Sequence, residues 1–315
     1  MRVHGARTIV SPDIGLRGPY RSVEYAIGNT PLVDLTGPLG VKTGSKVLAK
    51  LEFLNPGGSV KDRPALYIIR DALRSGVLRP GMVILDASSG NMAVSLAMVA
   101  GSYGYGTRLV VPGNVSSEKI GLLRLLGAEL VFTDPLEGID GAIRVARSIA
   151  ESDRRVYFYA NQYDNPSNLR AHYETTGAEI IRQTDGRVTH LVAGVGTSGT
   201  LMGAGRRLRE YKSSVKIVEV QPDSPLHGIE GLKHMPSSIK PKIYDPAFAD
   251  RLVEVSTEEA IRYSRILAAR AGVLGGISAG ANVAAAVSVA EENPGSVVVT
   301  IIPDGAARYL DILLR

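Results

Sequence analysis

The sequence predicts an α/β protein made of two three-layer α/β/α domains, each with a mainly parallel sheet between layers of helices. Short apolar runs rich in Val and Ile alternate with helical patterns along most of the 315 residues. This alternation is typical of parallel sheets that are covered on both faces. About ten such strands are more than one sheet of this kind usually holds, so we expect two domains.

The expected elements follow one another in a regular order. Strands are expected at residues 46–54, 83–86, 108–111, 129–132, 156–159, 190–193, 215–220, 252–255 and 296–302, after a short first strand that ends near residue 33. Helices are expected at residues 64–73, 92–103, 116–126, 139–150, 169–183, 200–211, 257–271 and 279–292. Pro64 suits the first turn of its helix, and Ser116 or Ser117 suits a helix cap. We expect residues 221–250 to be mainly loop and residues 1–20 to form an arm.

The composition excludes several classes of protein. The chain has no cysteine, which removes disulfides, thiolate nucleophiles and thiolate-bound metals. Its five histidines show no metal-ligand spacing, so no metal site is expected. The net charge of +5 is spread along the chain, and aromatic residues do not interleave with basic ones, so no nucleic-acid partner is expected. Residues 1–20 lack the apolar core of a secretory signal and no run suits a membrane span, so we expect a cytoplasmic protein without a membrane partner.

Four corners between a strand and a helix carry unusual residues. Ligands of open α/β sheets bind beyond the carboxyl ends of the strands, so the four corners are expected to share one cleft. The first corner is residues 55–63 (NPGGSVKDR), whose Pro and Gly residues force a turn. This turn would let Lys61 point into the cleft, and the alternative is a solvated surface lysine.

The other three corners combine glycine with hydroxyl groups at the start of a helix. Residues 87–91 (ASSGN) suit an anion such as a carboxylate, or form an ordinary helix cap. Residues 194–200 (GVGTSGT) are typical of a loop that binds a phosphate, or form a tight turn without a ligand. They lack the lysine of a nucleotide P-loop and the dinucleotide fingerprint. In residues 275–281 (GGISAGA), Ser278 could present its hydroxyl to a ligand nitrogen or cap the helix.

Together, in this order and spacing, the four corners resemble the fold-type II pyridoxal-phosphate enzymes, and within them the cysteine synthase and cystathionine β-synthase branch. The resemblance runs from IGNTPLV at Ile27 to PDGAARYL ending at Leu310, and includes residues 161–163 (NQY) and 172–177 (HYETTG). It implies a tryptophan synthase β-like fold, pyridoxal 5′-phosphate as cofactor, an amino-acid substrate and a homodimer. The expected N-terminal domain, residues 54–165, holds Lys61, and residues 21–53 with 166–315 form the other.

The resemblance also implies roles for individual residues. Lys61 matches the lysine that forms the Schiff base with the cofactor and then acts as the base at the substrate Cα. Asn91 matches the residue that hydrogen-bonds the ring hydroxyl, and Ser278 matches the serine that faces the pyridine nitrogen. The loop that holds the phosphate matches at Gly196, Thr197, Ser198, Gly199 and Thr200. The loop that closes on the substrate carboxylate matches at Ser88, Ser89, Gly90 and Met92, with Gln162 beside it.

Three positions depart from the commonest pattern of this family. Met92 replaces a threonine and cannot donate a hydroxyl hydrogen bond to the substrate carboxylate. Ser198 stands where many members have glycine. Lys233, within residues 231–235 (GLKHM), lies where phosphoserine-using members place an arginine. Lys233 could contact an anionic leaving group, and the alternative is a solvated lysine.

The resemblance predicts the activity of a cysteine synthase, which replaces the β-substituent of O-acetylserine or O-phosphoserine by sulfide or another sulfur donor. Cystathionine β-synthase or another β-replacement, such as diaminopropionate synthesis, is the nearest alternative. A serine or threonine dehydratase usually has a run of glycines at the phosphate loop, and GVGTSGT is not such a run. A non-catalytic binding homologue is the alternative from a different class, and an intact Lys61 argues against it.

Overall fold

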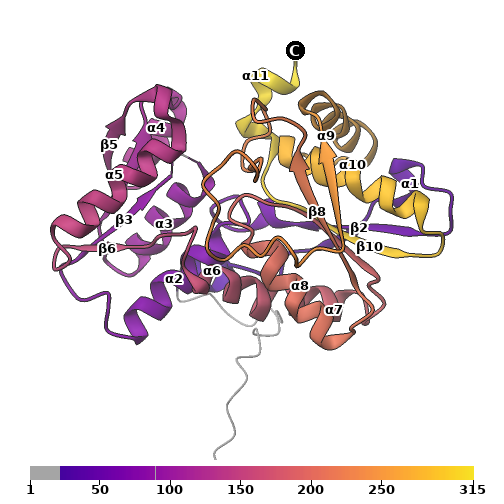
Figure 1. Cartoon of the computed structure of the whole chain (residues 1–315), viewed down its shortest axis with the longest axis horizontal. Coiled ribbons are helices and arrows are strands. Elements are labelled where there is room, and N and C mark those ends of the chain that lie inside the picture. Colours follow the sequence, from indigo (N-terminus) through magenta and orange to yellow (C-terminus); the bar gives the residue numbers. More distant parts are fainter. Residues whose placement is uncertain (1–21, 89) are drawn as a thin grey trace, which may run out of the picture.

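The described part of the chain forms two sheets, which confirms the predicted fold class. A computed structural model describes residues 22–88 and 90–315, so the expected arm at residues 1–20 and the expected substrate-loop residue Ser89 lie outside the described residues. One sheet has six strands and the other has four. Figure 1 shows each sheet in its own lobe of the molecule.

The four-stranded sheet and its helices form the smaller lobe. Its strands are β3 (Val83–Ala87), β4 (Thr107–Pro112), β5 (Glu129–Thr133) and β6 (Tyr157–Tyr159), all parallel and in the order β5-β4-β3-β6. The helices of this lobe are α2 (Asp62–Arg74), α3 (Asn91–Ser102), α4 (Ser117–Leu125) and α5 (Gly138–Ser152). The cap of α4 is Ser116, whose side chain accepts a hydrogen bond from the Lys119 N–H.

The six-stranded sheet combines an early segment with the second half of the chain. Its order is β1-β2-β10-β7-β8-β9, from β1 (Leu32–Asp34), β2 (Lys46–Leu51), β7 (His190–Gly194), β8 (Lys216–Pro222), β9 (Arg251–Val255) and β10 (Val297–Ile302). Only the pair of β1 and β2 is antiparallel. The main helices here are α6 (Pro166–Ala171), α7 (Ala178–Gln183), α8 (Gly199–Tyr211), α9 (Thr257–Ala271) and α10 (Ile277–Glu292). Each sheet falls within one of the two predicted domains, whose boundaries stay a prediction.

The structure differs from the prediction in three details. The strand expected at residues 46–54 ends at Leu51, because the chain turns there into a short 3-10 helix, η2 (Glu52–Leu54). The helix expected at residues 169–183 is divided, because α6 and α7 flank a wider π turn, η4 (His172–Gly177). The apolar period of the sequence does not distinguish such a turn from an α-helix. Two four-residue helices, α1 (Thr36–Leu39) and α11 (Leu310–Leu313), are not among the predicted elements, because so short a segment shows no helical period.

Burial explains the apolar, small-residue composition of α10. This helix packs against both α9 and β10, and Ala284, Ala285 and Ala286 are each at most 5% exposed. A Cβ on Gly280 would lie 1.8 Å from the Ala260 carbonyl oxygen, so α9 and α10 meet where only glycine fits. Within residues 22–88 and 90–315, no helix has both the length and the apolar character that crossing a bilayer requires.

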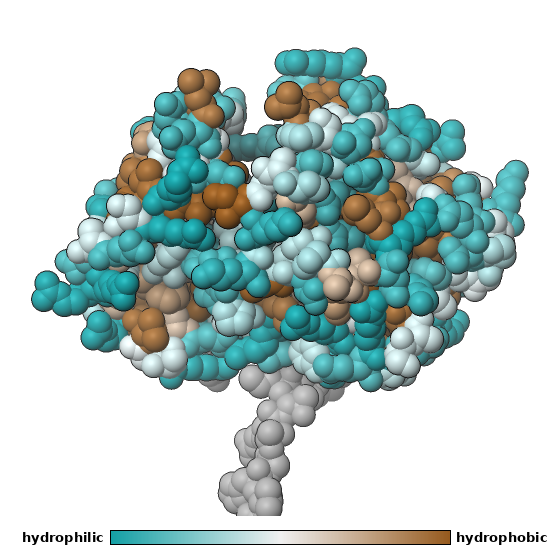
Figure 2. Space-filling view, viewed as in Figure 1, coloured by the Kyte–Doolittle hydropathy of each residue, from teal (hydrophilic) through white to brown (hydrophobic). Residues whose placement is uncertain are grey.

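The strand order brings three special loops to one edge of the six-stranded sheet. The strands β2, β10 and β7 are neighbours and run parallel, so their carboxyl ends point the same way. The Lys61 corner follows β2, Asp304 follows β10, and the loop at residues 194–200 follows β7. On the surface, Figure 2 shows a notch between the lobe that carries α4 and α5 and the lobe that carries α9 and α11.

Candidate active site

Asp62 holds the turn before Lys61 in a fixed shape. Its carboxylate accepts hydrogen bonds from the Gly57 N–H at 2.6 Å and from the Ser95 hydroxyl at 2.5 Å. A Cβ on Gly57 would lie 2.3 Å from Asp62 Oδ1, so this contact requires glycine. Burial raises the pKa of Asp62 to about 6, although both hydrogen bonds oppose the rise. The turn delivers Lys61 to the position directly before α2.

A buried ion cluster anchors the same corner from the other side. Arg63 is 1% exposed. Its guanidinium lies 2.7 Å from Glu52 and 2.6 Å from Glu179, and it donates to the Thr30 hydroxyl at 3.2 Å. Lys50 adds a second cation at 2.6 Å from Glu179. Because Glu179 belongs to α7, the cluster ties the start of α2 to the six-stranded lobe.

The amine of Lys61 is left without a partner. Its side chain is half-buried, and among residues 22–88 and 90–315 nothing forms a hydrogen bond or ion pair with Nζ. Burial lowers the pKa of Lys61, and the nearby Asp304 carboxylate partly offsets this effect. A lowered pKa increases the uncharged fraction of the amine near neutral pH, which is the form that acts as a nucleophile or base.

Asp304 belongs to this site, although the sequence predicts no role for it. It is 1% exposed and forms a β-bridge with Ser59, two residues before Lys61. Its Oδ2 accepts hydrogen bonds from the Tyr309 hydroxyl at 2.5 Å and from Asn91 Nδ2 at 2.7 Å. Burial raises its pKa, and both hydrogen bonds oppose the rise. The sequence signal for Asp304 is its place just after the last parallel strand, where ligand-binding residues gather.

The loop at residues 194–200 is shaped for close contact with an anion. A Cβ on Gly196 would lie 2.2 Å from the Gly231 carbonyl oxygen, so the backbone runs where no side chain fits. Ser198 adopts a left-handed conformation with φ of +69° directly before α8. Its hydroxyl is buried and has no hydrogen-bond partner in the described part of the chain. An unpaired hydroxyl at a helix N-terminus fits a bound anion.

Two buried side chains support this loop from behind. Asn168 donates from Nδ2 to the Thr197 hydroxyl at 3.0 Å and to the Gln162 carbonyl at 2.8 Å. His172 lies with Nε2 at 3.3 Å from the Thr200 hydroxyl. Burial lowers the pKa of His172 to about 3, so its ring is neutral around pH 7. The sequence predicts no role for Asn168, because nothing in its spacing separates it from an ordinary helical residue.

Ser278 lies at the start of α10 with its hydroxyl available. The N-cap of α10 is Gly276 and no side chain caps the helix, so the alternative that Ser278 caps this helix is wrong. The Gly276 N–H donates to the Asp304 carbonyl at 3.0 Å, which brings this corner next to Asp304. Ser278 is 3% exposed, and its hydroxyl makes no hydrogen bond to any other described residue.

The second corner presents mainly backbone groups. The N-cap of α3 is Gly90, without a side-chain cap, and its N–H lies 3.4 Å from the hydroxyl of Ser88. The ordinary-cap alternative therefore does not describe Ser88, which is 7% exposed. Met92 is 2% exposed and packs in a core cluster with residues of α2, so only its backbone N–H could face a substrate. Binding of a carboxylate here stays a prediction.

Gln162 already has protein partners. It is 3% exposed, and its Nε2 donates to Asp86 Oδ2 at 3.1 Å and to the Ala87 carbonyl at 3.3 Å. Burial raises the pKa of Asp86 to about 7, and hydrogen bonds from the backbone and from Gln162 oppose the rise. With both amide hydrogens directed at Asp86 and Ala87, a contact of Gln162 with a substrate carboxylate stays a prediction.

Lys233 connects the two lobes. Its Nζ lies 3.3 Å from Asp140 Oδ1 of α5, donates to the Ile239 carbonyl at 3.3 Å, and sits 4.9 Å from the centre of the Tyr163 ring. The residue is 8% exposed, so the alternative of a solvated lysine is wrong. A contact with an anionic leaving group would require Lys233 to leave Asp140, and this role stays a prediction.

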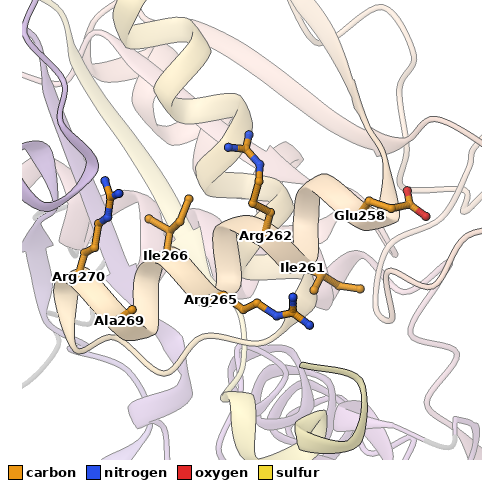
Figure 3. A pocket seen from close by; sticks show the side chains of 7 residues that line it. All are labelled: Glu258, Ile261, Arg262, Arg265, Ile266, Ala269 and Arg270. Carbon is orange, nitrogen blue, oxygen red and sulfur yellow. The ribbon is translucent and has the colours of Figure 1, made fainter. Parts of the chain in front are cut away.

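Two surface hollows lie away from these corners. One of about 450 Å³ is lined by residues of α9 alone (Figure 3). Another of about 480 Å³ is lined by residues between 76 and 159 of the smaller lobe. Neither includes a residue of the four corners. The candidate site is therefore defined by its side chains and close backbone contacts rather than by the size of a hollow.

Comparison with known proteins identifies the family. A family model described as "Pyridoxal-phosphate dependent enzyme" matches residues 23–304. The chain belongs to this family. The residues of this pyridoxal-phosphate dependent enzyme fit its cofactor, because Lys61 has a free amine for the aldehyde and the loop at 194–200 has an unpaired hydroxyl and close backbone for the phosphate.

Individual relatives narrow the family to the cysteine synthases. This pyridoxal-phosphate dependent enzyme is 46% identical to the cysteine synthase of Aquifex aeolicus (strain VF5) over 306 residues. The matched residues cover 94% of each of the two chains. The crystal structure of cysteine synthase from Entamoeba histolytica superposes with a TM-score of 0.89 at 34% identity, over 99% of this chain and 93% of that one. An O-ureido-L-serine synthase structure superposes with a TM-score of 0.88 at 38% identity, over 94% and 96%.

The close contact at Gly196 predicts that a methyl group there weakens cofactor binding. Gly196→Ala places a Cβ against the Gly231 backbone, so the loop must shift. We expect the dissociation constant for pyridoxal phosphate to rise about tenfold or more, measured by titration of the cofactor-free protein. Gly121→Ala in α4 is the control, because a Cβ there meets nothing within 4 Å. Equal affinities of the two variants would contradict the prediction.

Proposed function

We propose that this enzyme is a cysteine synthase that converts O-acetylserine or O-phosphoserine, with sulfide or another sulfur donor, into L-cysteine. The observation that carries the proposal is the unpaired Lys61 amine in a corner held by Asp62 and Arg63, near the Asp304 carboxylate. Asp304 in turn contacts the Asn91 side chain and the Gly276 N–H, two residues before Ser278. The similarity to cysteine synthases over nearly the whole chain supports it. We also propose a homodimer, as the resemblance implies, and a cytoplasmic location, as the sequence predicts.

The protein residues have separate tasks in this proposal. When bound, pyridoxal phosphate supplies an electron sink that stabilises negative charge at the substrate Cα. Lys61 would hold the cofactor covalently until the amine of the substrate displaces it, and the released Lys61 amine would then take the proton from Cα and later return it. Burial supports this role of Lys61, because a lowered pKa favours the uncharged amine. The N–H groups and hydroxyls of residues 196–200 hold the phosphate at the start of α8.

Ser278 would set the type of reaction, and the second corner would bind the substrate. The neutral hydroxyl of Ser278, in place of a carboxylate, would leave the pyridine nitrogen largely unprotonated. The weaker electron sink favours loss and replacement of the β-substituent over transamination. The backbone N–H groups around Gly90, at the start of α3, would bind the substrate carboxylate together with Ser88 and Ser89. Closure of the domains over the substrate follows from the resemblance.

Steady-state rates with matched substrates test the proposal. The purified enzyme is assayed with O-acetylserine and with O-phosphoserine, each against sulfide and against homocysteine. We expect cysteine formation from at least one ester with sulfide, and a change in cofactor absorbance when that ester is added without sulfide. An unchanged absorbance with both esters would contradict the proposal. Faster reaction with homocysteine or with an amine would assign the enzyme to another β-replacement.

A further inference from the structure

The side-chain amide of Asn91 is held in one orientation. Its Nδ2 donates to Asp304 Oδ2 at 2.7 Å, and its Oδ1 accepts a hydrogen bond from Arg308 Nη1. A guanidinium only donates, and an ionised carboxylate only accepts. Turning the amide over would place oxygen against oxygen and N–H against N–H. The two charged partners therefore exclude the flipped amide.

This orientation leaves one donor of Asn91 for a ligand. The amide nitrogen carries two hydrogens, and Asp304 accepts one of them. Asp304 also accepts from the Tyr309 hydroxyl on the same oxygen, at 2.5 Å, which completes the protein partners of that oxygen. The ring of pyridoxal phosphate carries a hydroxyl next to the aldehyde that Lys61 would hold. An ionised ring oxygen in that position needs a donor, and the second N–H of Asn91 supplies it.

We propose that Arg308 and Asp304 are positioning residues for the cofactor, which fix Asn91 as a hydrogen-bond donor to the ring hydroxyl oxygen. The proposal rests on the cofactor role of Asn91 in the proposed function. Arg308 has a second contact that fits this task, because its Nη2 donates to the Gly57 carbonyl at 2.8 Å. One arginine from the C-terminal segment thus joins the turn before Lys61 to the start of α3.

The proposal is tested by comparing the binding of the cofactor with the binding of an analogue that lacks the ring hydroxyl. Cofactor-free protein is titrated by calorimetry with pyridoxal phosphate and with 3-deoxypyridoxal phosphate, which lacks the ring hydroxyl. Arg308→Met is expected to weaken binding of pyridoxal phosphate about tenfold, the effect of one hydrogen bond, and to leave binding of the analogue unchanged. Arg308→Lys, which keeps a donor, should recover part of the loss. Arg262→Met, at an exposed arginine of α9, should behave like the wild type.

The outcomes separate this proposal from the proposed function. The positioning role would be overturned if Arg308→Met weakened the binding of both ligands equally, or weakened the binding of neither. If that variant does not fold, as judged from melting of the cofactor-free protein, Asp304→Asn replaces it. This variant removes one of the two partners that hold the Asn91 amide in its orientation, so it should reduce the preference for the ring hydroxyl, and an unchanged preference overturns the proposal. Failure of the wild type to bind pyridoxal phosphate would refute the proposed function itself.

Discussion

Replacing Lys61 by alanine is expected to abolish covalent attachment of the cofactor and to lower the rate of β-replacement by about 10³-fold or more. The expectation follows from the two tasks proposed for one amine, which would hold the cofactor and move the Cα proton. Borohydride treatment followed by peptide mapping should find the cofactor attached to the peptide with Lys61 in the wild type, and to no peptide in Lys61→Ala. Steady-state assays measure the rate.

The control for this prediction is the same substitution at a lysine outside the candidate site. Lys42 is exposed, and the structure gives it no role in the corners described above. Lys42→Ala should therefore keep both the attached cofactor and the wild-type rate. A Lys61→Ala enzyme that still carries borohydride-fixed cofactor, or that works within tenfold of the wild type, would show that another group performs these tasks.

Replacing Arg63 by alanine is expected to lower the free energy of unfolding by about 3–5 kcal/mol. The change leaves the buried carboxylates of Glu52 and Glu179 with Lys50 as the remaining cation of the cluster. Desolvation of unpaired charge, rather than loss of contact area, accounts for a cost of this size. Urea unfolding of the cofactor-free protein, followed by circular dichroism, measures it.

An exposed ion pair provides the matched control for Arg63. Arg187 pairs with Asp185 at 3.1 Å, with side chains 69% and 80% exposed. Arg187→Ala should change the free energy of unfolding by only about 0.5 kcal/mol or less, because water screens exposed pairs. Similar effects of the Arg63 and Arg187 substitutions would show that the buried cluster is not a main source of stability.

The same cluster predicts how stability depends on pH. Burial alone would raise the pKa values of Glu52 and Glu179, but Arg63 and Lys50 reverse this and hold both values below the usual range. A depressed folded-state pKa contributes stability above the unfolded pKa of roughly 4.3, and this contribution is lost as pH falls through the folded value. The stability gap between wild type and Arg63→Ala should therefore narrow below about pH 5. Urea midpoints measured from pH 7 to pH 3 test it, and a gap that widens with acid would contradict it.

Most elements of the fold could be predicted because they repeat a local pattern. The strand at 190–193 and the helix at 257–271 show a clear apolar period, and both are found within a residue of their predicted ends. The π turn at 172–177 could not be predicted, because one wider turn leaves the apolar period unchanged. The two four-residue helices are too short to show a period at all.

The candidate site divides in a similar way between sequence and structure. Lys61 and the loop at 194–200 stand out because glycine and proline mark their turns locally. The support from Asn168, which reaches both the Thr197 hydroxyl and the Gln162 carbonyl, has no local signal. The partner of Lys233 is equally hidden, since Asp140 lies 93 positions away along the chain. Such contacts exist only after two lobes have packed together.

The sequence by itself determined the class of fold, the four corners and the family that they resemble, because strand and helix periods and turn residues are properties of neighbouring positions. Only the tertiary structure decided that Lys61 has a free amine, that Gly276 and not Ser278 caps α10, and that Asp304 and Arg308 orient Asn91. The physical reason is that hydrogen-bond partners and burial depend on which strands become neighbours. The parallel order of β2, β10 and β7 determines these partners and this burial for residues that are far apart in the chain.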